Sequence, residues 1–573
     1  MALSQTARGP VWARTALLGS NIGELVAAVA WSGFLALAIA GPWLSVSGYL
    51  FGTDWPGPRH FHLTPTISAS IPAEAFFTAA SLISAELAGK LLVVAILFAA
   101  AFFAYRAVPA GTFGPRGAGA AIYVFNPFVF GRLHYGQLFL LAGYALLPWV
   151  AIRLRDLCRE PTWLAGLILA ISVSLVAVFT LHLVFVSAVL TAVVVPVYLV
   201  GAKQRVEYAK RLIPALAVAA GATFLLSSYW AVPLVMGRSS EAAVIGGTSP
   251  GLLSAYAAVP DQSVGLVPNL LGLYGFWAEN SRRFTSMKAF VPEWPVVLFV
   301  LLVICGVGVV AAFRRKDRNL APWTAGLVLA AMIGLILEMG ISHPLTSGFV
   351  HWLDTNVPIY RGMRDAGKWA ALLALVYSQL FGLGAAAILD WIRKVRLPTP
   401  QVEWVGAVMV GLLLALPVYY GNGLLFGMHG EIKPSEYPAG WYAADRMLLA
   451  DPHPGRTLFL PWHEYMSFGF IQNQNRVVAS PAVTFFSVPI VSSANPEIGG
   501  SPPAEPEQIA ITQLVGAGAT GDWSHQLAQM GIKYVLVARE VDWQGYAYFA
   551  SQPGLDLVRD YGSIVLYRNT LVT

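Results

Sequence analysis

The sequence places an aspartate, an arginine and two histidines close together, just after its first long apolar segment. Asp54 lies among the turn-forming residues of the stretch 52–58, and Arg59, His60 and His62 follow it. A carboxylate held in a turn can act as a general base, and the neighbouring cation and imidazoles can bind a polar or anionic substrate. The same stretch is equally typical of a solvated turn. Its meaning therefore depends on where the rest of the chain places it.

A second charged group precedes a later apolar segment. Arg361, Arg364, Asp365 and Lys368 are spaced i, i+3, i+4 and i+7, so in a helix they would share one continuous face. Three cations with one carboxylate suit a phosphate or pyrophosphate, because Arg offers forked donors and Lys a point charge. The alternative is that the cations meet anionic lipid headgroups or that Asp365 neutralises them locally.

Two further places add polar candidates. The stretch 126–137 holds Arg132, His134 and Gln137 within a few residues of one another. We interpret Arg132 as a further phosphate ligand and the other two as substrate ligands, although interfacial residues that anchor helix ends have the same composition. His182 lies in a very tight turn between two apolar segments. It is a weaker substrate-binding candidate, because a lone histidine there is more often a satisfied interface residue.

Composition indicates a polytopic membrane protein. The chain is 57% hydrophobic and only 12% charged, far from the averages of soluble proteins. A helix needs about 20 apolar residues to cross a bilayer. About eleven segments approach this length: 25–44, 89–107, 117–131, 137–152, 163–181, 183–200, 212–236, 294–313, 320–340, 369–389 and 403–426. Glu338 is the one clear acid within a predicted span, but it lies close enough to the end to snorkel.

The distribution of positive charge predicts the orientation. Half of the Lys and Arg residues fall in the N-terminal tail and in alternate connections on one side. By the positive-inside rule that side is cytoplasmic, which puts the N-terminus inside and the C-terminus outside the plasma membrane. The net charge of +6 therefore reflects topology. Because the basic residues are dispersed over turns, they predict no nucleic-acid partner.

The chain is predicted to divide once, into a transmembrane part, 1–429, and an extracytoplasmic α/β domain, 430–573. The second part loses the apolar runs, and its patterns predict strands at 456–461, 533–538 and 563–567 and a helix at 523–530. The segment 65–87, with apolar residues among small and polar ones, predicts an amphipathic helix in the membrane interface. Cys158 and Cys305 form no metal-binding pattern, so no metal ligands are predicted.

Several of these stretches resemble a known class. The order of parts is similar to the GT-C class of membrane glycosyltransferases, and within it to the membrane α-(1→3)-arabinofuranosyltransferases and the related proteins that glycosylate teichoic acid. The resemblance rests on the stretches 126–137, 144–149, 229–234 and 364–369. It implies a polyprenyl-phosphate sugar donor and a catalytic base in the first outer loop, the position of Asp54. The acidic pair of the metal-dependent oligosaccharyltransferases is not visible, so a divalent metal is neither required nor excluded.

The functional hypothesis is a glycosyltransferase that moves a sugar from a polyprenyl-phosphate donor to a glycan or glycolipid acceptor at the outer face. Asp54 would be the base, and Arg59, Arg132, Arg361, Arg364 and Lys368 would bind the donor phosphate. The substrate ligands would be His60, His62, His134, Gln137 and His182. The alternative is a transporter or lipid flippase of the cell envelope, but such proteins place ionisable groups deep in the bundle and often contain inverted repeats. A third hypothesis is a non-catalytic scaffold whose outer domain recruits a partner.

Overall fold

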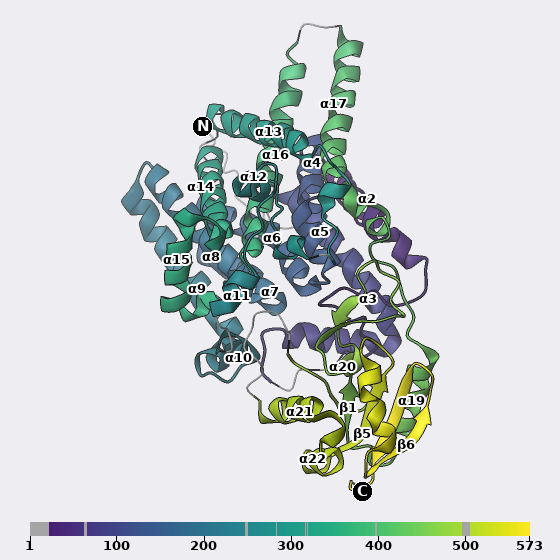
Figure 1. Cartoon of the computed structure of the whole chain (residues 1–573). Helices are drawn as coiled ribbons and strands as arrows, with labels where there is room; N and C mark the ends of the chain where they lie inside the picture. Colours follow the sequence, from purple (N-terminus) through teal and green to yellow (C-terminus); the bar gives the residue numbers. More distant parts are fainter. Residues whose placement is uncertain are drawn as a thin grey trace.

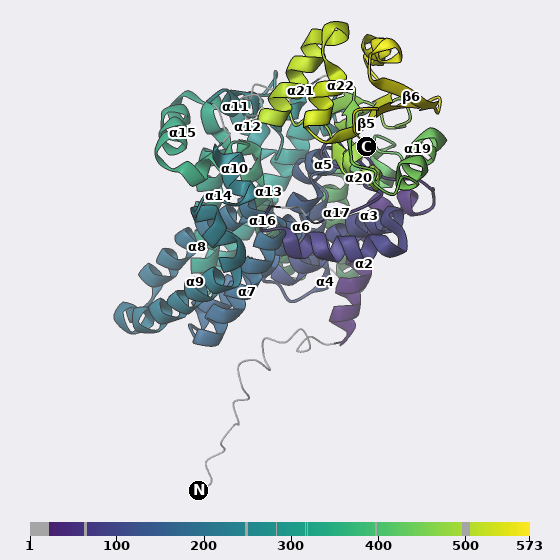
Figure 2. The ribbon, with the colours of Figure 1, turned by 90° about the horizontal axis from the view of Figure 1, so that it is seen from below.

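The computed structural model consists of a large helical bundle and a smaller C-terminal α/β domain beside one end of it (Figure 1). The structure describes residues 22–61, 63, 66–246, 250–281, 283–315, 317, 319–395, 398–495 and 505–572. Viewed at right angles, the C-terminal domain again lies at one end of the bundle (Figure 2).

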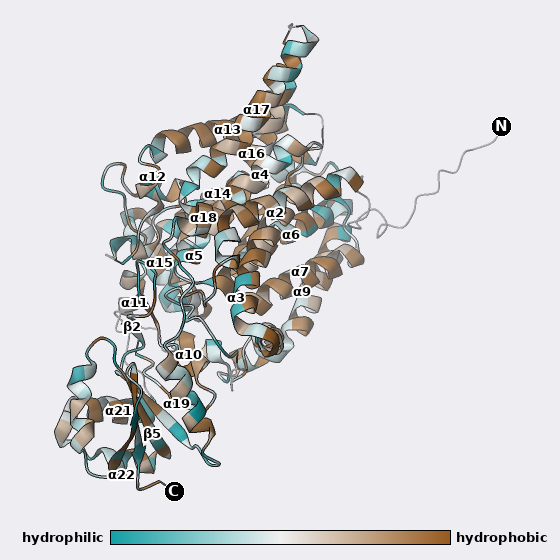
Figure 3. Ribbon diagram, turned by 90° about the vertical axis from the view of Figure 1, so that its right-hand side faces the viewer, coloured by the Kyte–Doolittle hydropathy of each residue, from teal (hydrophilic) through white to brown (hydrophobic). Residues whose placement is uncertain are grey.

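Within the described residues, nine helices are long and apolar enough to cross a membrane. A tenth apolar helix, α7 (Trp163–Phe179), is slightly shorter. Hydrophobic residues dominate these helices, whereas polar and apolar residues are mixed along the ribbon of the C-terminal domain (Figure 3). The protein is therefore a multi-pass membrane protein. The nine long helices are α2 (Ile22–Leu44), α3 (Ile71–Ala107), α6 (Leu138–Arg159), α8 (Leu181–Gly201), α9 (Arg205–Val235), α13 (Trp294–Arg314), α14 (Leu320–Met339), α16 (Ala370–Ile392) and α17 (Thr399–Tyr420).

The predicted span 117–131 is not one helix, which is the main difference from the eleven expected. It is divided into α4 (Phe113–Val124) and α5 (Pro127–His134). Pro127 disfavours helical backbone at Asn126, which is extended instead. The Asn126 side chain then caps α5 by accepting a hydrogen bond from the Val129 N–H at 3.0 Å. Both short helices are buried in the bundle, and the turn after α5 reaches the candidate site.

The predicted amphipathic segment 65–87 is helical from Ile71 onward, as the first part of α3. Ser84 has non-helical backbone and kinks α3 there. Leu82 and Ile83 are 85% and 90% exposed, which is what an apolar face against lipid would require. This part lies crosswise where the bundle meets the C-terminal domain (Figure 1).

Shorter helices fill the connections. The end of α16 and the start of α17 lie at the end of the bundle opposite the C-terminal domain (Figures 1 and 3). The short α-helices are α10 (Ser240–Gly246), α11 (Pro250–Ala255), α12 (Leu266–Leu271), α15 (Pro344–Asn356) and α18 (Leu425–Met428). The 3-10 segments are η2 (Trp277–Asn280), η3 (Met287–Ala289), η4 (Gly340–Ser342), η5 (Pro358–Met363), η6 (Ala366–Trp369) and η7 (Asn422–Leu424).

The C-terminal domain is built on a five-stranded mixed sheet in the order β4-β1-β5-β7-β6, with a separate β2–β3 hairpin. β1 is parallel to β4 and β5, and β7 is antiparallel to β5 and β6. The three predicted strands and the predicted helix are confirmed. The strands are β1 (Arg456–Leu460), β2 (Tyr465–Ser467), β3 (Val477–Ala479), β4 (Ile490–Val491), β5 (Ile532–Ala538), β6 (Leu555–Asp560) and β7 (Ile564–Asn569). The helical segments are α19 (Ala439–Leu449), α20 (Ala482–Phe485), α21 (Pro506–Ala517), η8 (Gly518–Thr520), α22 (Trp523–Gln529) and η9 (Trp543–Ser551).

Alternation along the strands gives the sheet two apolar faces. Phe459 and Leu536 belong to one buried cluster with Trp441 of α19, whereas Leu458 and Val535 belong to another with Trp523 of α22. Helices therefore cover both faces of the sheet. The β2–β3 hairpin forms a separate sheet, packs Met466 and Val478 into the first of these clusters, and reaches the loop that carries Asp54.

Candidate active site

Asp54 lies in a loop that packs against the turn between α5 and α6. The Asp54 N–H donates a hydrogen bond to the Tyr135 carbonyl oxygen at 2.7 Å. The two backbones approach so closely that a Cβ on Gly52 would lie 2.6 Å from the Gly136 Cα, and Gly136 has a φ of +75°. Glycine at both positions is therefore required by contact and conformation. This approach brings the loop between α2 and α3, which carries Asp54, to the turn that carries Gln137.

The Asp54 carboxylate receives one hydrogen bond on each oxygen. The Gln137 Nε2 donates to Oδ2 at 2.8 Å, and the Tyr465 hydroxyl donates to Oδ1 at 3.1 Å. The carboxylate faces a cavity and is solvent-accessible, yet protein surrounds most of it. Partial desolvation raises the pKa of Asp54, while the hydrogen bonds from Gln137 and Tyr465 offset part of that rise. A raised pKa suits a carboxylate that must accept a proton.

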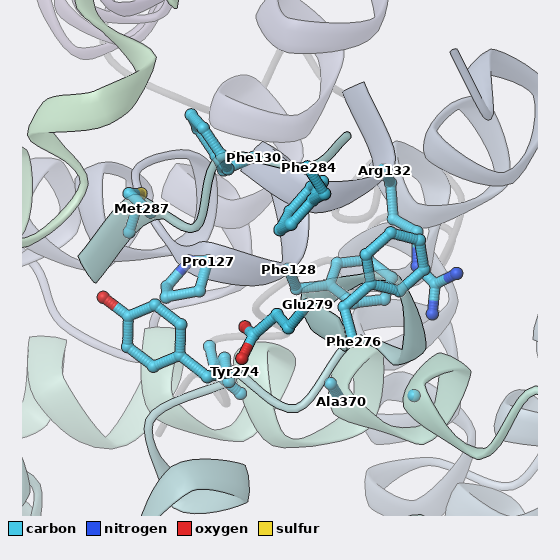
Figure 4. A pocket seen from close by; sticks show the side chains of 13 residues that line it. Pro127, Phe128, Phe130, Arg132, Tyr274, Phe276, Glu279, Phe284, Met287 and Ala370 are labelled. Carbon is cyan, nitrogen blue, oxygen red and sulfur yellow. The ribbon is translucent and has the colours of Figure 1, made fainter. Parts of the chain in front are cut away.

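Arg132 lies behind this carboxylate and is already paired. Its guanidinium forms a buried ion pair with Asp365 at 2.5 Å and donates to the Gln137 Oε1 at 2.8 Å. The aromatic rings of Phe128 and Phe276 lie 5.4 and 4.5 Å from the guanidinium (Figure 4). A continuous polar chain therefore runs from Asp365 through Arg132 and Gln137 to Asp54. The predicted role of Arg132 as a direct phosphate ligand does not fit this geometry, because its guanidinium is buried and paired with Asp365.

Burial alone would raise the pKa of Asp365, but Arg132 and Lys368 outweigh that effect and hold the pKa of this carboxyl below its usual value. Asp365 is therefore an anion that balances Arg132. Its Oδ1 also accepts a hydrogen bond from the Gly367 N–H at 3.1 Å, which caps η6.

Asp54 faces a polar cavity of about 450 Å³. Its walls come from the α2–α3 loop, the α5–α6 turn, the loop around η2, the segment before α16 and the β2–β3 hairpin. The lining residues are Thr53, Asp54, Tyr135, Gln137, Tyr256, Trp277, Ser281, Arg283, Arg364, Asp365, Lys368, Tyr465, Asn475 and Val477.

A second cavity of about 460 Å³ lies on the other side of Arg364 and Lys368. Its walls are mostly apolar and come from α8, α9, α10 and η5. The lining residues are Leu181, His182, Val184, Phe185, Ala188, Trp230, Leu234, Ser240, Glu241, Val244, Ile245, Ile359, Gly362, Arg364 and Lys368. Arg364 and Lys368 line both cavities. They therefore stand between a polar space that contains Asp54 and an apolar space among membrane helices.

These two cations differ from Arg59 and Arg132, which are both paired with aspartates. In the part of the chain that the structure describes, neither Arg364 nor Lys368 forms an ion pair within 4.0 Å, in contrast to Arg132. The Arg364 guanidinium lies 5.3 Å from the centre of the Tyr256 ring. Both side chains are half-buried, so an anion placed between the cavities would meet partly desolvated donors. Such donors interact more strongly than fully hydrated ones.

The predicted single helical face of residues 361–368 is wrong. The segment forms two 3-10 turns, η5 and η6, because Asp365 takes extended backbone to cap η6. Arg361 consequently turns away from its predicted partners. Its Nε donates to the Asp354 carbonyl oxygen at 3.0 Å, and it lines neither cavity.

The structure also moves Arg59 and His60 away from the cavity. Arg59 forms an ion pair with Asp445 of α19 at 2.6 Å, and its guanidinium lies over Tyr442 and Phe485. The His60 Nε2 lies 3.3 Å from the Ser487 hydroxyl. Both residues hold the α2–α3 loop to the C-terminal domain and do not line either cavity. His62 lies outside the described residues.

The remaining predicted histidines separate into two cases. His182 lines the apolar cavity next to the cations, with its Nδ1 3.0 Å from the Thr180 hydroxyl. His134 is buried elsewhere, with its Nε2 3.5 Å from a carboxylate oxygen of Glu431, so its predicted contact with substrate does not fit. Glu338 is fully buried and lines neither cavity.

Sequence reasoning missed the cavity residues supplied by distant segments. Tyr465 and Asn475 come from the C-terminal domain, and Tyr256 and Trp277 come from the connection between α9 and α13. The available signal was the number of aromatic residues in the outer connections. Among the described residues, no three His, Cys, Asp or Glu side chains are grouped closely enough to hold a metal ion.

The chain combines a bundle of membrane helices, a carboxylate in the loop between α2 and α3 and an α/β domain at that end of the bundle, and its fold is similar to the GT-C fold of a membrane glycosyltransferase. Solved structures of arabinofuranosyltransferase AftD from mycobacteria are similar to it in fold. One matches 96% of this chain with a TM-score of 0.59 at 17% identity. Two structures of a mutant AftD match with TM-scores of 0.57 and 0.54, at 17% and 16% identity, over 97% and 96% of this chain.

The chain spans about two fifths of the AftD chains that it matches, with coverages of 40%, 42% and 41%. No protein-family model matches the sequence. No curated protein matches it either. The likeness is therefore one of fold, and the site residues must support the function on their own.

Proposed function

We propose that this protein is a membrane glycosyltransferase that moves a sugar from a polyprenyl-phosphate donor to a hydroxyl of a glycan or glycolipid acceptor at the outer face of the membrane. The observation that carries the proposal is the position of Arg364 and Lys368 between a polar and an apolar cavity. A polyprenyl-phosphate sugar has the same order of parts: an apolar chain, an anionic phosphate and a polar sugar.

In this arrangement the lipid chain occupies the space between α8, α9 and α10. The phosphate lies between Arg364 and Lys368, and the sugar extends toward Asp54. Arg can bind two phosphate oxygens and Lys adds a point charge. The likeness in fold to an arabinofuranosyltransferase supports the choice of a sugar donor and makes a furanose the first sugar to test.

The chemistry follows from this placement. The acceptor hydroxyl oxygen attacks the anomeric carbon and its proton passes to Asp54, while the bond between that carbon and the phosphate oxygen breaks. The phosphate oxygen leaves with the bonding electrons, and Arg364 and Lys368 stabilise the polyprenyl phosphate anion. A general base contributes about 10²- to 10⁴-fold to such a transfer.

The decisive experiment is a transfer assay with purified protein in lipid nanodiscs. Radiolabelled polyprenyl-phosphate arabinofuranose and a polyprenyl-phosphate hexose would be offered with alkyl glycoside acceptors. A new glycosidic bond, formed by the parent protein and lost in Asp54→Asn, is the expected result. If a fluorescent polyprenyl-phosphate instead crosses the membrane of proteoliposomes without any glycosidic product, the protein is a flippase.

The proposed sidedness has its own test. Cys158 and Cys305 are buried, so they should add little background when a thiol reagent labels a single new cysteine. Ser551→Cys lies on the exposed surface of the C-terminal domain and Gln204→Cys in the exposed α8–α9 connection. An impermeant thiol reagent should label the first in intact cells and not the second. The opposite pattern would place the cavity in the cytoplasm.

A further inference from the structure

The C-terminal domain is in direct contact with the loop that carries Asp54. The Ala479 N–H of β3 donates to the Thr53 carbonyl oxygen at 2.8 Å, and the Asn475 side chain donates to the Thr53 hydroxyl at 3.2 Å. Just before them, the Asn473 side chain donates to the Phe51 carbonyl oxygen at 2.7 Å. The β2–β3 hairpin therefore holds the backbone on one side of Asp54, and the α5–α6 turn holds the other side.

The hairpin also reaches the carboxylate itself. Tyr465 at the start of β2 donates its hydroxyl proton to the Asp54 Oδ1, opposite the bond from Gln137 to Oδ2. Burial and the neighbouring Asp54 raise the pKa of Tyr465, so the phenol stays protonated and acts as a donor. Two donors on two different oxygens fix the plane of the carboxylate. Since each carboxylate oxygen can accept more than one hydrogen bond, room remains for an acceptor hydroxyl.

We propose that Tyr465 of the C-terminal domain is a positioning residue that orients the Asp54 carboxylate and keeps it ionised, so that the outer domain is part of the catalytic unit. This inference rests on the proposed function, in which Asp54 is the base. The inference goes beyond the proposed function because it gives the C-terminal domain a direct contact with the carboxylate that accepts the proton. A domain that merely covers the cavity would need no hydrogen bond to the carboxylate.

A hydrogen bond to the charged form of an acid lowers its pKa. Removal of the Tyr465 hydroxyl should therefore raise the pKa of Asp54 further, by about 0.5 to 1 unit for a bond of ordinary strength. The same charged and titratable neighbours would remain in parent and variant. They are Arg132, Arg283, Arg364, Lys368, Asp365, Tyr135 and Tyr256.

The test compares Tyr465→Phe with Tyr534→Phe in the full-length protein. Tyr534 also donates to an aspartate, Asp451, at 2.8 Å in the same domain, but it lines neither cavity. A carbodiimide reacts with protonated carboxyl groups, so its rate of reaction at Asp54, followed by peptide mass spectrometry against pH, reports the pKa without any acceptor. The expected result is a midpoint 0.5 to 1 unit higher in Tyr465→Phe and unchanged in Tyr534→Phe.

In the transfer assay, the acid limb of the pH profile should move to higher pH in Tyr465→Phe, while the KM for polyprenyl-phosphate arabinofuranose stays at the parent value. An Asp54 midpoint equal to that of the parent overturns the inference. An equal shift in both variants also overturns it, because loosening of the domain would then be the cause. If the midpoint moves only in Tyr465→Phe but the parent transfers no sugar, the contact stands and the proposed function fails.

Discussion

The two cavities that meet at Arg364 and Lys368 have nearly the same volume, about 450 and 460 Å³, but their walls differ. One is lined by two carboxylates, two amides, phenols and cations, and residues of the C-terminal domain form part of its wall. The other is lined chiefly by aliphatic and aromatic side chains of membrane helices. Equal space with opposite chemistry favours an amphiphilic ligand with its charge at the junction, because each half of such a ligand finds a matching environment.

The largest loss of transfer is expected from a substitution in the polar cavity. Asp54→Asn keeps the shape of the side chain and removes its basicity. We expect transfer to fall by about 10²-fold or more, with donor affinity unchanged, because the phosphate site lies at other residues. The measurement is turnover together with donor binding in nanodiscs. Near-normal turnover would make Asp54 structural and direct the search to Asp365.

The next largest effect is expected at the junction, the place between the two cavities where Arg364 and Lys368 lie. Arg364→Ala and Lys368→Ala should each weaken binding of the polyprenyl-phosphate sugar, since each removes a charge-assisted contact of about 1.5–3 kcal/mol, or roughly 10- to 100-fold in Kd. The change is measured by titration of the donor into nanodisc-bound protein.

Arg361→Ala is the matched control for these two variants. It removes a cation from the same segment, but Arg361 bonds the Asp354 carbonyl oxygen and faces neither cavity. Its donor affinity should equal that of the parent. If all three variants behave alike, whether weakened or unchanged, the junction is not a phosphate site.

The proposed binding of the lipid chain in the apolar cavity can be tested by filling part of that cavity with a larger side chain. Ala188→Trp places a large ring in the apolar cavity. Each buried methylene contributes about 0.8 kcal/mol, so exclusion of about two of them should weaken a long-chain donor roughly tenfold. A water-soluble donor analogue with a short alkyl chain should bind as before. Ala192→Trp, one turn along α8 and exposed but outside both cavities, controls for the added bulk.

The same division separates what the sequence could predict from what it could not. The membrane helices and the strands were predictable, because long apolar runs and strand alternation are local signals. Asp54 was recognisable as a candidate because turn residues and an apolar span flank it. Arg59 and Arg132 were placed in the phosphate site because a sequence shows their charge but not their partners, Asp445 and Asp365, which lie hundreds of residues away.

The segment 361–368 shows a second limit. Its i, i+3, i+4, i+7 spacing predicts a helical face only if the backbone is helical, and a single capping aspartate changed that. Arg364 and Lys368 still lie together, between the two cavities, whereas Arg361 lines neither cavity. Tyr465 was beyond prediction for a different reason: its contact with Asp54 joins residues 411 positions apart, and only the packing of the C-terminal domain against the α2–α3 loop creates it.

The smallest expected effect concerns divalent metal ions. Arg364 and Lys368 supply two positive charges at the junction, which is enough to balance the two negative charges of the departing polyprenyl phosphate, a monoester dianion. The described residues form no cluster of three metal ligands, and Asp365 is already paired with Arg132. We therefore expect EDTA to change the rate of transfer by less than about twofold, which is small beside the loss of about 10²-fold expected for Asp54→Asn.

A larger loss of transfer that Mg²⁺ or Mn²⁺ restores would show instead that an ion bridges the phosphate to Asp54. Asp54 is the cavity carboxylate that can still accept further bonds, because Asp365 is paired with Arg132. That outcome would shift Asp54 from base to metal ligand and weaken the contrast between the junction and the polar cavity.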